Sequence, residues 1–149
     1  MIESIAAVVT AVGVVFAGLQ LRAAQVQRVR EFESLYVQRY WKIVDGLPLG
    51  ELDSGTPYEQ LSEKDRKSVE MYVLLCEDQY EMRKEGAISR STFAIWRQGI
   101  DNVREREPFL GAAAQIQARR NTTLTLLRTN AAHDPFDGRR VSGWVRGVG

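Results

Sequence analysis

The stretch IAAVVTAVGVVFAGLQL, from Ile5 to Leu21, carries no charge and has Thr10 and Gln20 as its polar residues. As an α-helix it would be about 25 Å long, at the short end of what a bilayer core of about 30 Å requires. A helix that is apolar on every side must be buried in lipid or in protein. A core helix of such a small domain would show a polar face, so we predict that residues 1–21 form a transmembrane anchor.

Two alternatives to an anchor have to be weighed. A cleaved signal peptide would open with a positively charged region, whereas Met1-Ile2-Glu3-Ser4 carries a negative charge there. The other alternative is an apolar helix buried inside a soluble oligomer, which cell fractionation would distinguish from a membrane span.

The basic residues around this stretch predict its orientation. No Lys or Arg precedes it, and five follow within about 20 residues, the distance over which basic residues set membrane topology; these are Arg22, Arg28, Arg30, Arg39 and Lys42. We therefore expect a single-pass protein of the inner membrane, with its N-terminus outside and its body in the cytoplasm.

One face of the expected anchor carries small or weakly polar side chains. Ala6, Thr10, Gly13 and Ala17 recur at alternating steps of four and three residues. Such stripes let helix backbones approach closely, so one hypothesis is a homo-oligomer that associates through these four residues. The alternative is that Gly and Ala are simply frequent in transmembrane helices.

The rest of the composition limits the function classes. The 149 residues leave room for one domain beyond the anchor. Because 20 Lys and Arg stand against 19 Asp and Glu, no nucleic-acid partner is expected. The single cysteine, Cys76, cannot form an intrachain disulfide, which suits a reducing compartment.

The remaining chain predicts an all-α fold in which the transmembrane helix continues into a cytoplasmic antiparallel bundle of about four helices, residues 22–132. No Pro or Gly occurs from 22 to 44, so the first helix should run on unbroken. Residues 45–62 are rich in Gly and Pro and are expected to form a long loop, a mobile spacer by default. Apolar residues then recur at helical spacing in the sets Val29, Phe32, Tyr36, Tyr40, Ile43; Val69, Tyr72, Val73, Cys76, Tyr80; Phe93, Trp96, Ile100, Val103; and Phe109, Leu110, Ala113, Ile116, Leu124, Leu127.

Helix ends are also marked in the sequence. Ser62 and Ser89 are expected as N-caps, Gly86 as the residue just past a helix end, and Pro108 as a residue of the first turn of the last helix. Asn121-Thr122-Thr123 weakens that helix in its middle. We expect Trp41 and Trp96 to pack in the core, as large aromatics at helical spacing usually do.

Residues 133–149 have no helical period and predict a flexible C-terminal tail. Three arginines and a tryptophan among them are candidates for contact with anionic lipid: Arg139, Arg140, Trp144 and Arg146. The alternative is a disordered end without a ligand.

No catalytic, cofactor-binding or metal-binding site is predicted. Several acids crowd residues 62–85, but a carboxylate di-metal bundle requires a Glu-x-x-His pair from each of two helices, and the sole histidine, His133, lies in the tail. Glu81, Arg83, Lys84 and Glu85 are instead expected to form a solvated face. Cys76 lies on an apolar stripe, without a histidine nearby in sequence to activate it.

The layout carries one resemblance. Leu19-Gln20-Leu21-Arg22 leads from a short uncharged anchor to Phe32-Glu33-x-Leu35-Tyr36, and a helical body with a Trp before its last helices follows. This layout resembles families of small bacterial single-pass membrane proteins of unknown function, best over the anchor and the first body helix. The resemblance implies a membrane location and brings no catalytic residues.

The prediction is therefore a non-enzymatic, membrane-anchored helical interaction or scaffold protein with an unknown protein partner. The alternative from another class is a small membrane effector or pore-forming protein that assembles through its transmembrane helix. An enzyme acting on a membrane-associated substrate is a third possibility, which a cleft with strongly perturbed carboxylates would support.

Overall fold

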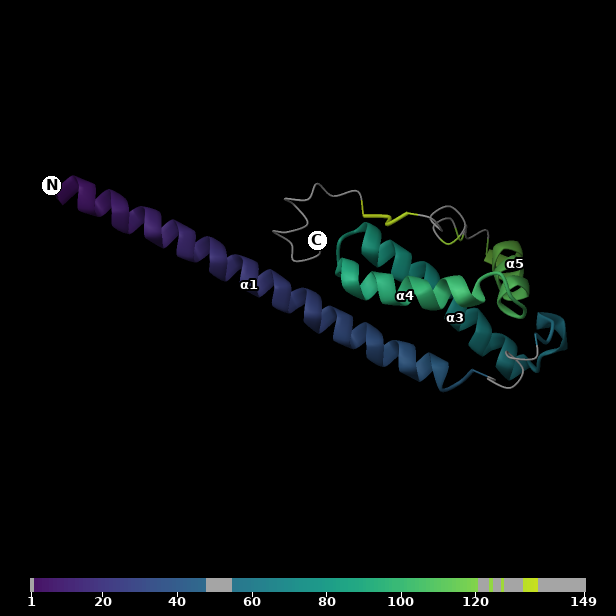
Figure 1. The fold of residues 1–149 in the computed structure, drawn as a ribbon. Helices are drawn as coiled ribbons and strands as arrows, with labels where there is room; N and C mark the ends of the chain where they lie inside the picture. The colour runs from purple at the N-terminus through teal and green to yellow at the C-terminus, as the bar shows by residue number, and fades with distance from the viewer. Residues whose placement is uncertain (1, 48–54, 121–123, 125–126, 128–132, 137–149) are drawn as a thin grey trace.

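The computed structural model describes residues 2–47, 55–120, 124, 127 and 133–136, and the described part is α-helical without a β-strand (Figure 1). In chain order the elements are α1 (Ile2–Val44), a short 3-10 helix η1 (Tyr58–Gln60), α3 (Glu63–Lys84), α4 (Arg90–Val103) and α5 (Phe109–Arg120). The predicted all-α class is confirmed.

The predicted anchor and the first helix of the body form one uninterrupted helix, α1, of 43 residues. Its N-terminal half projects away from the body, and its C-terminal half lies beside α3 and α4 (Figure 1). Ile43 is buried, and Phe32, Tyr36 and Tyr40 pack against the core. These residues belong to the stripe that the sequence predicts.

Helix α3 is the centre of the body, because it contacts α1, α4 and α5. It runs antiparallel to both α1 and α4 (Figure 1). Its predicted stripe is buried in full: Val69, Tyr72, Val73, Cys76 and Tyr80. Four helices thus share one core, as a bundle does.

Three of the four predicted helix-end signals lie where expected, and the fourth, Pro108, directly precedes α5 instead of lying in its first turn. The Ser62 hydroxyl accepts a hydrogen bond from the Asp65 backbone N–H at 3.2 Å, and the Ser89 hydroxyl accepts one from Thr92 at 3.3 Å. Gly86 follows α3 with φ +73°, a conformation that favours glycine. Both N-caps and the glycine after α3 are confirmed.

Two predicted core residues lie on the surface instead. Trp41 is 57% exposed and Leu110 is 52% exposed. Each directly follows a residue that packs inward, Tyr40 on α1 and Phe109 on α5. One step along an α-helix turns the side chain by about 100°, because 3.6 residues make one turn, and this step carries both residues off the buried stripe.

The end of the predicted 45–62 loop packs on the body and is more than a spacer. Tyr58 in η1 is buried, and its hydroxyl donates a hydrogen bond to Glu70 of α3. A Cβ on Gly111 of α5 would lie 2.5 Å from the Tyr58 Cβ, so a glycine is needed for this close approach. Residues 48–54 of the loop and the predicted weak point at 121–123 lie outside the described residues.

Candidate functional site

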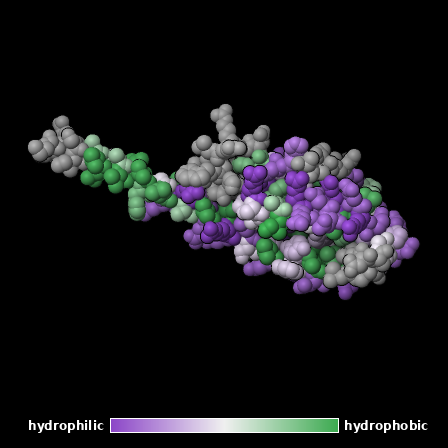
Figure 2. Space-filling view, viewed as in Figure 1, coloured by the Kyte–Doolittle hydropathy of each residue, from purple (hydrophilic) through white to green (hydrophobic). Residues whose placement is uncertain are grey.

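The N-terminal half of α1 presents an apolar surface that the rest of the described chain does not cover. The large apolar residues of this half are each at least 56% exposed: Val8, Val9, Val12, Val14, Val15, Phe16, Leu19 and Leu21. Figure 2 shows this part as a mostly green rod beside a body with much hydrophilic surface. A contiguous exposed apolar surface of this kind marks a membrane or protein contact.

Helix α1 also meets the length and composition of a membrane span. Within the described chain, the stretch Ala7–Val44 is the one helix long and apolar enough to cross a membrane. None of its most apolar stretch of 18 residues is buried. The helix therefore agrees with the predicted anchor in place, length and composition. The kind of membrane and the orientation stay predictions.

The residues predicted for self-association lie on this projecting half. Thr10, Gly13 and Ala17 are exposed, and the side chain of Ala6 is outside the described part. A Cβ added at Gly13 would meet nothing within 4 Å. The structure of one chain thus leaves this stripe open and does not test whether a second copy covers it. The four tail residues proposed for lipid contact, at 139, 140, 144 and 146, lie outside the described residues.

A cavity of about 390 Å³ lies among α3, α4 and α5. Its volume falls within the range of small-molecule pockets. Most of its wall is apolar, and Arg104 and Glu105 supply charged groups. Five apolar residues of the wall are Ile100, Phe109, Leu110, Ala113 and Leu124.

Two titratable side chains that line this cavity, Cys76 and Tyr72, have raised pKa values. Burial raises the pKa of the Cys76 thiol well above its ordinary value of 9.0, and burial likewise raises the pKa of Tyr72. Neither group ionises near neutral pH, so neither acts as a nucleophile or base there. The described residues include no group of three or more His, Cys, Asp or Glu side chains that could hold a metal ion.

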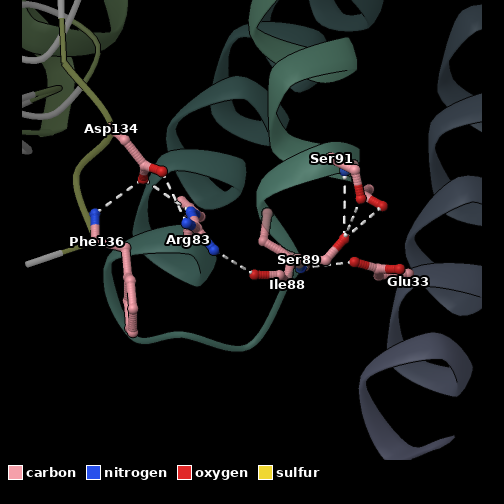
Figure 3. A network of polar contacts seen from close by, with 8 residues as sticks. Glu33, Arg83, Ile88, Ser89, Ser91, Asp134 and Phe136 are labelled. Carbon is pink, nitrogen blue, oxygen red and sulfur yellow. Dashed lines mark hydrogen bonds and ion pairs between the residues drawn. The ribbon is translucent and has the colours of Figure 1, made fainter. Parts of the chain in front are cut away.

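A buried arginine, Arg83, lies in the last turn of α3 and contacts several segments of the chain (Figure 3). Arg83 is 2% exposed and forms two hydrogen bonds with the Asp134 carboxylate, at 2.8 and 2.7 Å. It also donates to the Ile88 carbonyl at 2.9 Å, and its guanidinium carbon lies 4.8 Å from the centroid of the Phe136 ring. This arrangement satisfies a buried charge with a carboxylate, a carbonyl and an aromatic face.

Arg83 and Asp134 correct two sequence predictions. Arg83 does not belong to the solvated face, because it is enclosed between α3, the turn after it and the segment 133–136. That segment was expected to be the start of a flexible tail, whereas Asp134 and Phe136 hold it on the body. The sequence gives no signal for this contact, since the two charges are 51 residues apart.

Three acids of α3 make contacts with three different parts of the chain. Glu70 accepts from Tyr58 and lies 3.3 Å from Arg119 of α5. Glu77 accepts from the Leu127 backbone N–H at 2.8 Å, and Asp78 pairs with Arg39 of α1 at 3.3 Å. These three acids therefore each join α3 to a different neighbour.

Helix α4 is fastened to α1 at its first turn. The Glu33 carboxylate accepts a hydrogen bond from the Ser89 backbone N–H at 2.7 Å (Figure 3). A few residues along α1, the rings of Tyr36 and Trp96 stack with centroids 5.6 Å apart. Trp96 packs against the core, as predicted.

Comparisons of the chain with protein-family models, with curated proteins and with solved structures found no match to any of them.

Proposed function

We propose that this protein is a single-pass membrane protein whose helix α1 anchors a non-enzymatic helical interaction module at the cytoplasmic face of the inner membrane. The observation that carries the proposal is the exposure of the projecting half of α1. None of the most apolar 18 residues of this helix is buried against the described chain. Burying a large apolar side chain is worth about 1.5–3 kcal/mol. Transfer of the eight exposed large residues into lipid is therefore worth on the order of 10 kcal/mol.

The body supports an interaction role through its cavity among α3, α4 and α5. Helix α5, which supplies part of the cavity wall, lies at the end of the body away from the projecting half of α1 (Figure 1). Leu110 lines it and is exposed. An apolar pocket with an exposed apolar rim suits an anchor side chain of a protein partner.

The anchoring role is tested by alkaline carbonate extraction and vesicle flotation of the full chain. Wild type should stay with the membrane. Replacing Val12 and Val15 by Asp places two charges near the middle of the span, each costing about 2.5–3.5 kcal/mol, and should shift most of the protein to the soluble fraction. The matched Val→Leu double variant should behave as wild type. Full-length wild type that stays soluble and monodisperse would contradict the proposal.

The interaction role is tested by photo-crosslinking from the cavity rim in intact cells. A photoreactive residue at 113 should give a discrete adduct, and Leu110→Glu should abolish it. Ile95→Glu is the matched control, because Ile95 is also exposed, on α4, but does not line the cavity. An adduct that survives Leu110→Glu would remove the cavity from the proposal.

A further inference from the structure

We propose that an anionic phospholipid of the surrounding bilayer binds in a groove between α1 and the turn that joins α3 to α4. This inference rests on the proposed membrane anchoring. The groove has a volume of about 440 Å³ and is lined by Leu21, Gln25, Arg28, Val29, Phe32, Gly86 and Ala87.

The groove lies where the anchor leaves the membrane. Leu21 is both the last residue of the predicted anchor and a part of the groove wall. Arg28 follows seven residues later, about 10 Å along the helix axis. The headgroup layer on each side of a bilayer is about 5–8 Å thick, half the difference between the hydrocarbon core and the full bilayer. The groove therefore begins at the level of the lipid headgroups, and the Arg28 backbone lies about 2–5 Å beyond them.

The shortness of the anchor brings the groove closer to the lipid. A span of about 25 Å in a core of about 30 Å is relieved by local thinning of the bilayer and by flanking residues that extend toward the interface. Side chains of an α-helix tilt toward its N-terminus, which here is the direction of the bilayer. Arg28 thus reaches back toward the phosphates, as long basic side chains at membrane surfaces do.

The charges in the groove favour an anion. Arg28 has no ion-pair partner within the described chain, and none of the seven lining residues is acidic. A guanidinium forms two parallel hydrogen bonds with a phosphate group, a geometry that an ammonium lacks. The Gln25 amide, one turn nearer the membrane, supplies a second donor.

The apolar wall fits the glycerol and the upper part of an acyl chain. Val29 and Phe32 line the groove, and its wall continues through Leu21 into the exposed apolar surface around Leu19. The side facing α1 is built from Gly86 and Ala87, the smallest residues. Phe136 packs closely on this turn, because a Cβ at Gly86 would lie 2.7 Å from its ring.

The test is native mass spectrometry of the full chain released from nanodiscs that contain equal amounts of phosphatidylglycerol and phosphatidylcholine. Wild type should retain phosphatidylglycerol about fivefold over phosphatidylcholine, the ratio that about 1 kcal/mol per basic residue gives. Arg28→Gln should bring the ratio to about one. Arg30→Gln is the matched control, because Arg30 is exposed on the same helix but does not line the groove. Ala87→Leu, which fills the groove without changing its charge, should reduce the adducts of both lipids.

In the lipid mixture, two outcomes would overturn the inference: equal retention of both lipids by wild type, or enrichment that survives Arg28→Gln. A separate measurement in lipid-free detergent with inorganic phosphate distinguishes the two sources of the anion: wild type should form no phosphate adduct that Arg28→Gln loses, and such an adduct would contradict a lipid site. Carbonate extraction of the same variants keeps this result apart from the anchoring proposal. A chain that resists extraction and shows no lipid preference fails here alone, whereas a chain that is extracted fails as an anchor.

Discussion

At the scale of single residues, the ion pair between Arg83 and Asp134 is the contact that the sequence could not predict. An arginine on a helix with many charged residues is usually solvated. Arg83 is buried instead, because Ile88, Asp134 and Phe136 surround it. Removal of one partner of a buried pair leaves an uncompensated charge, which is costly in a protein interior. The stability of the body therefore depends on a segment near the C-terminal end of the described chain.

The first prediction concerns the pH dependence of this pair. Partial burial raises the pKa of the Asp134 carboxyl, but hydrogen bonds from Arg83 and from the Phe136 backbone N–H outweigh burial and lower the pKa below its ordinary 3.8. A lowered folded-state pKa gives stability that is present above the unfolded value and lost as the pH falls through the folded value. Asp134→Asn should therefore lower the free energy of unfolding by about 2 kcal/mol above pH 5, less than for a fully buried pair because Asp134 is 30% exposed. The difference from wild type should shrink below about pH 4.

The measurement is urea unfolding of the full chain in non-ionic detergent, followed by tryptophan fluorescence at several pH values. Arg39→Gln serves as the control, because its pair with Asp78 lies on the surface and is worth about 0–1 kcal/mol. A destabilisation by Asp134→Asn that is the same at pH 3 and pH 7 would contradict the assigned role of the carboxylate.

Gly86 provides a second prediction. Its φ of +73° disfavours any other residue, and an added Cβ would also meet the Phe136 ring at 2.7 Å. Gly55 has a similar φ of +67° with nothing within 4 Å of the added Cβ. Gly55→Ala should cost about 1 kcal/mol for the backbone alone, and Gly86→Ala about 2 kcal/mol or more. Equal effects in urea unfolding would show that the Phe136 contact adds nothing.

At the scale of elements, the sequence predicts what is local, and the structure adds what is distant in sequence. The continuity of α1, the serine caps of α3 and α4 and the buried stripe of α3 all follow from spacing and short-range chemistry. The prediction that Trp41 and Leu110 are buried is wrong, because each lies one residue beyond the buried stripe of its helix. Apolar character alone does not show which of two adjacent residues faces the core. The packing of Tyr58 on α5 depends on Gly111, 53 residues later in the chain, and periodicity carries no information about it.

The third prediction concerns the projecting half of α1. Because a Cβ at Gly13 meets nothing within 4 Å in one chain, Gly13→Ile should leave the folding of the monomer unchanged. If two copies associate through the stripe, the same substitution together with Ala17→Ile should abolish association in a membrane two-hybrid assay, because bulky side chains prevent close backbone approach. Val12→Ile is the matched control. An unchanged signal would rule out this stripe as the interface.

At the scale of the whole molecule, the distribution of charge and apolar surface gives the protein two unlike ends. The projecting half of α1 is apolar, and the basic residues that follow it predict a cytoplasmic body. Fold class and the place of the apolar helix could be predicted from the sequence, since they depend on composition and period. The position of the cavity and of the groove could not, because each is enclosed by elements from distant parts of the chain.

The fourth prediction tests this orientation with single cysteines in a Cys76→Ala background. A cysteine at Ser4 should react with a membrane-impermeant maleimide in intact spheroplasts, whereas a cysteine at Ser34, which is exposed on α1, should react only after lysis. The physical reason is the excess of Arg and Lys after the apolar stretch. Reversed labelling would contradict the orientation and leave the anchor itself intact.

The unbroken course of α1 also sets how the body can move. No hinge separates the proposed span from the bundle, since one helix runs from Ile2 to Val44 and is fastened to α4 through Glu33. From Leu21 to Val44 the helix rises about 35 Å. Because the proposed span and the first helix of the bundle are one helix, the body cannot pivot relative to the span. We expect the body to change its orientation and its distance from the bilayer only when the whole of α1 tilts or rotates.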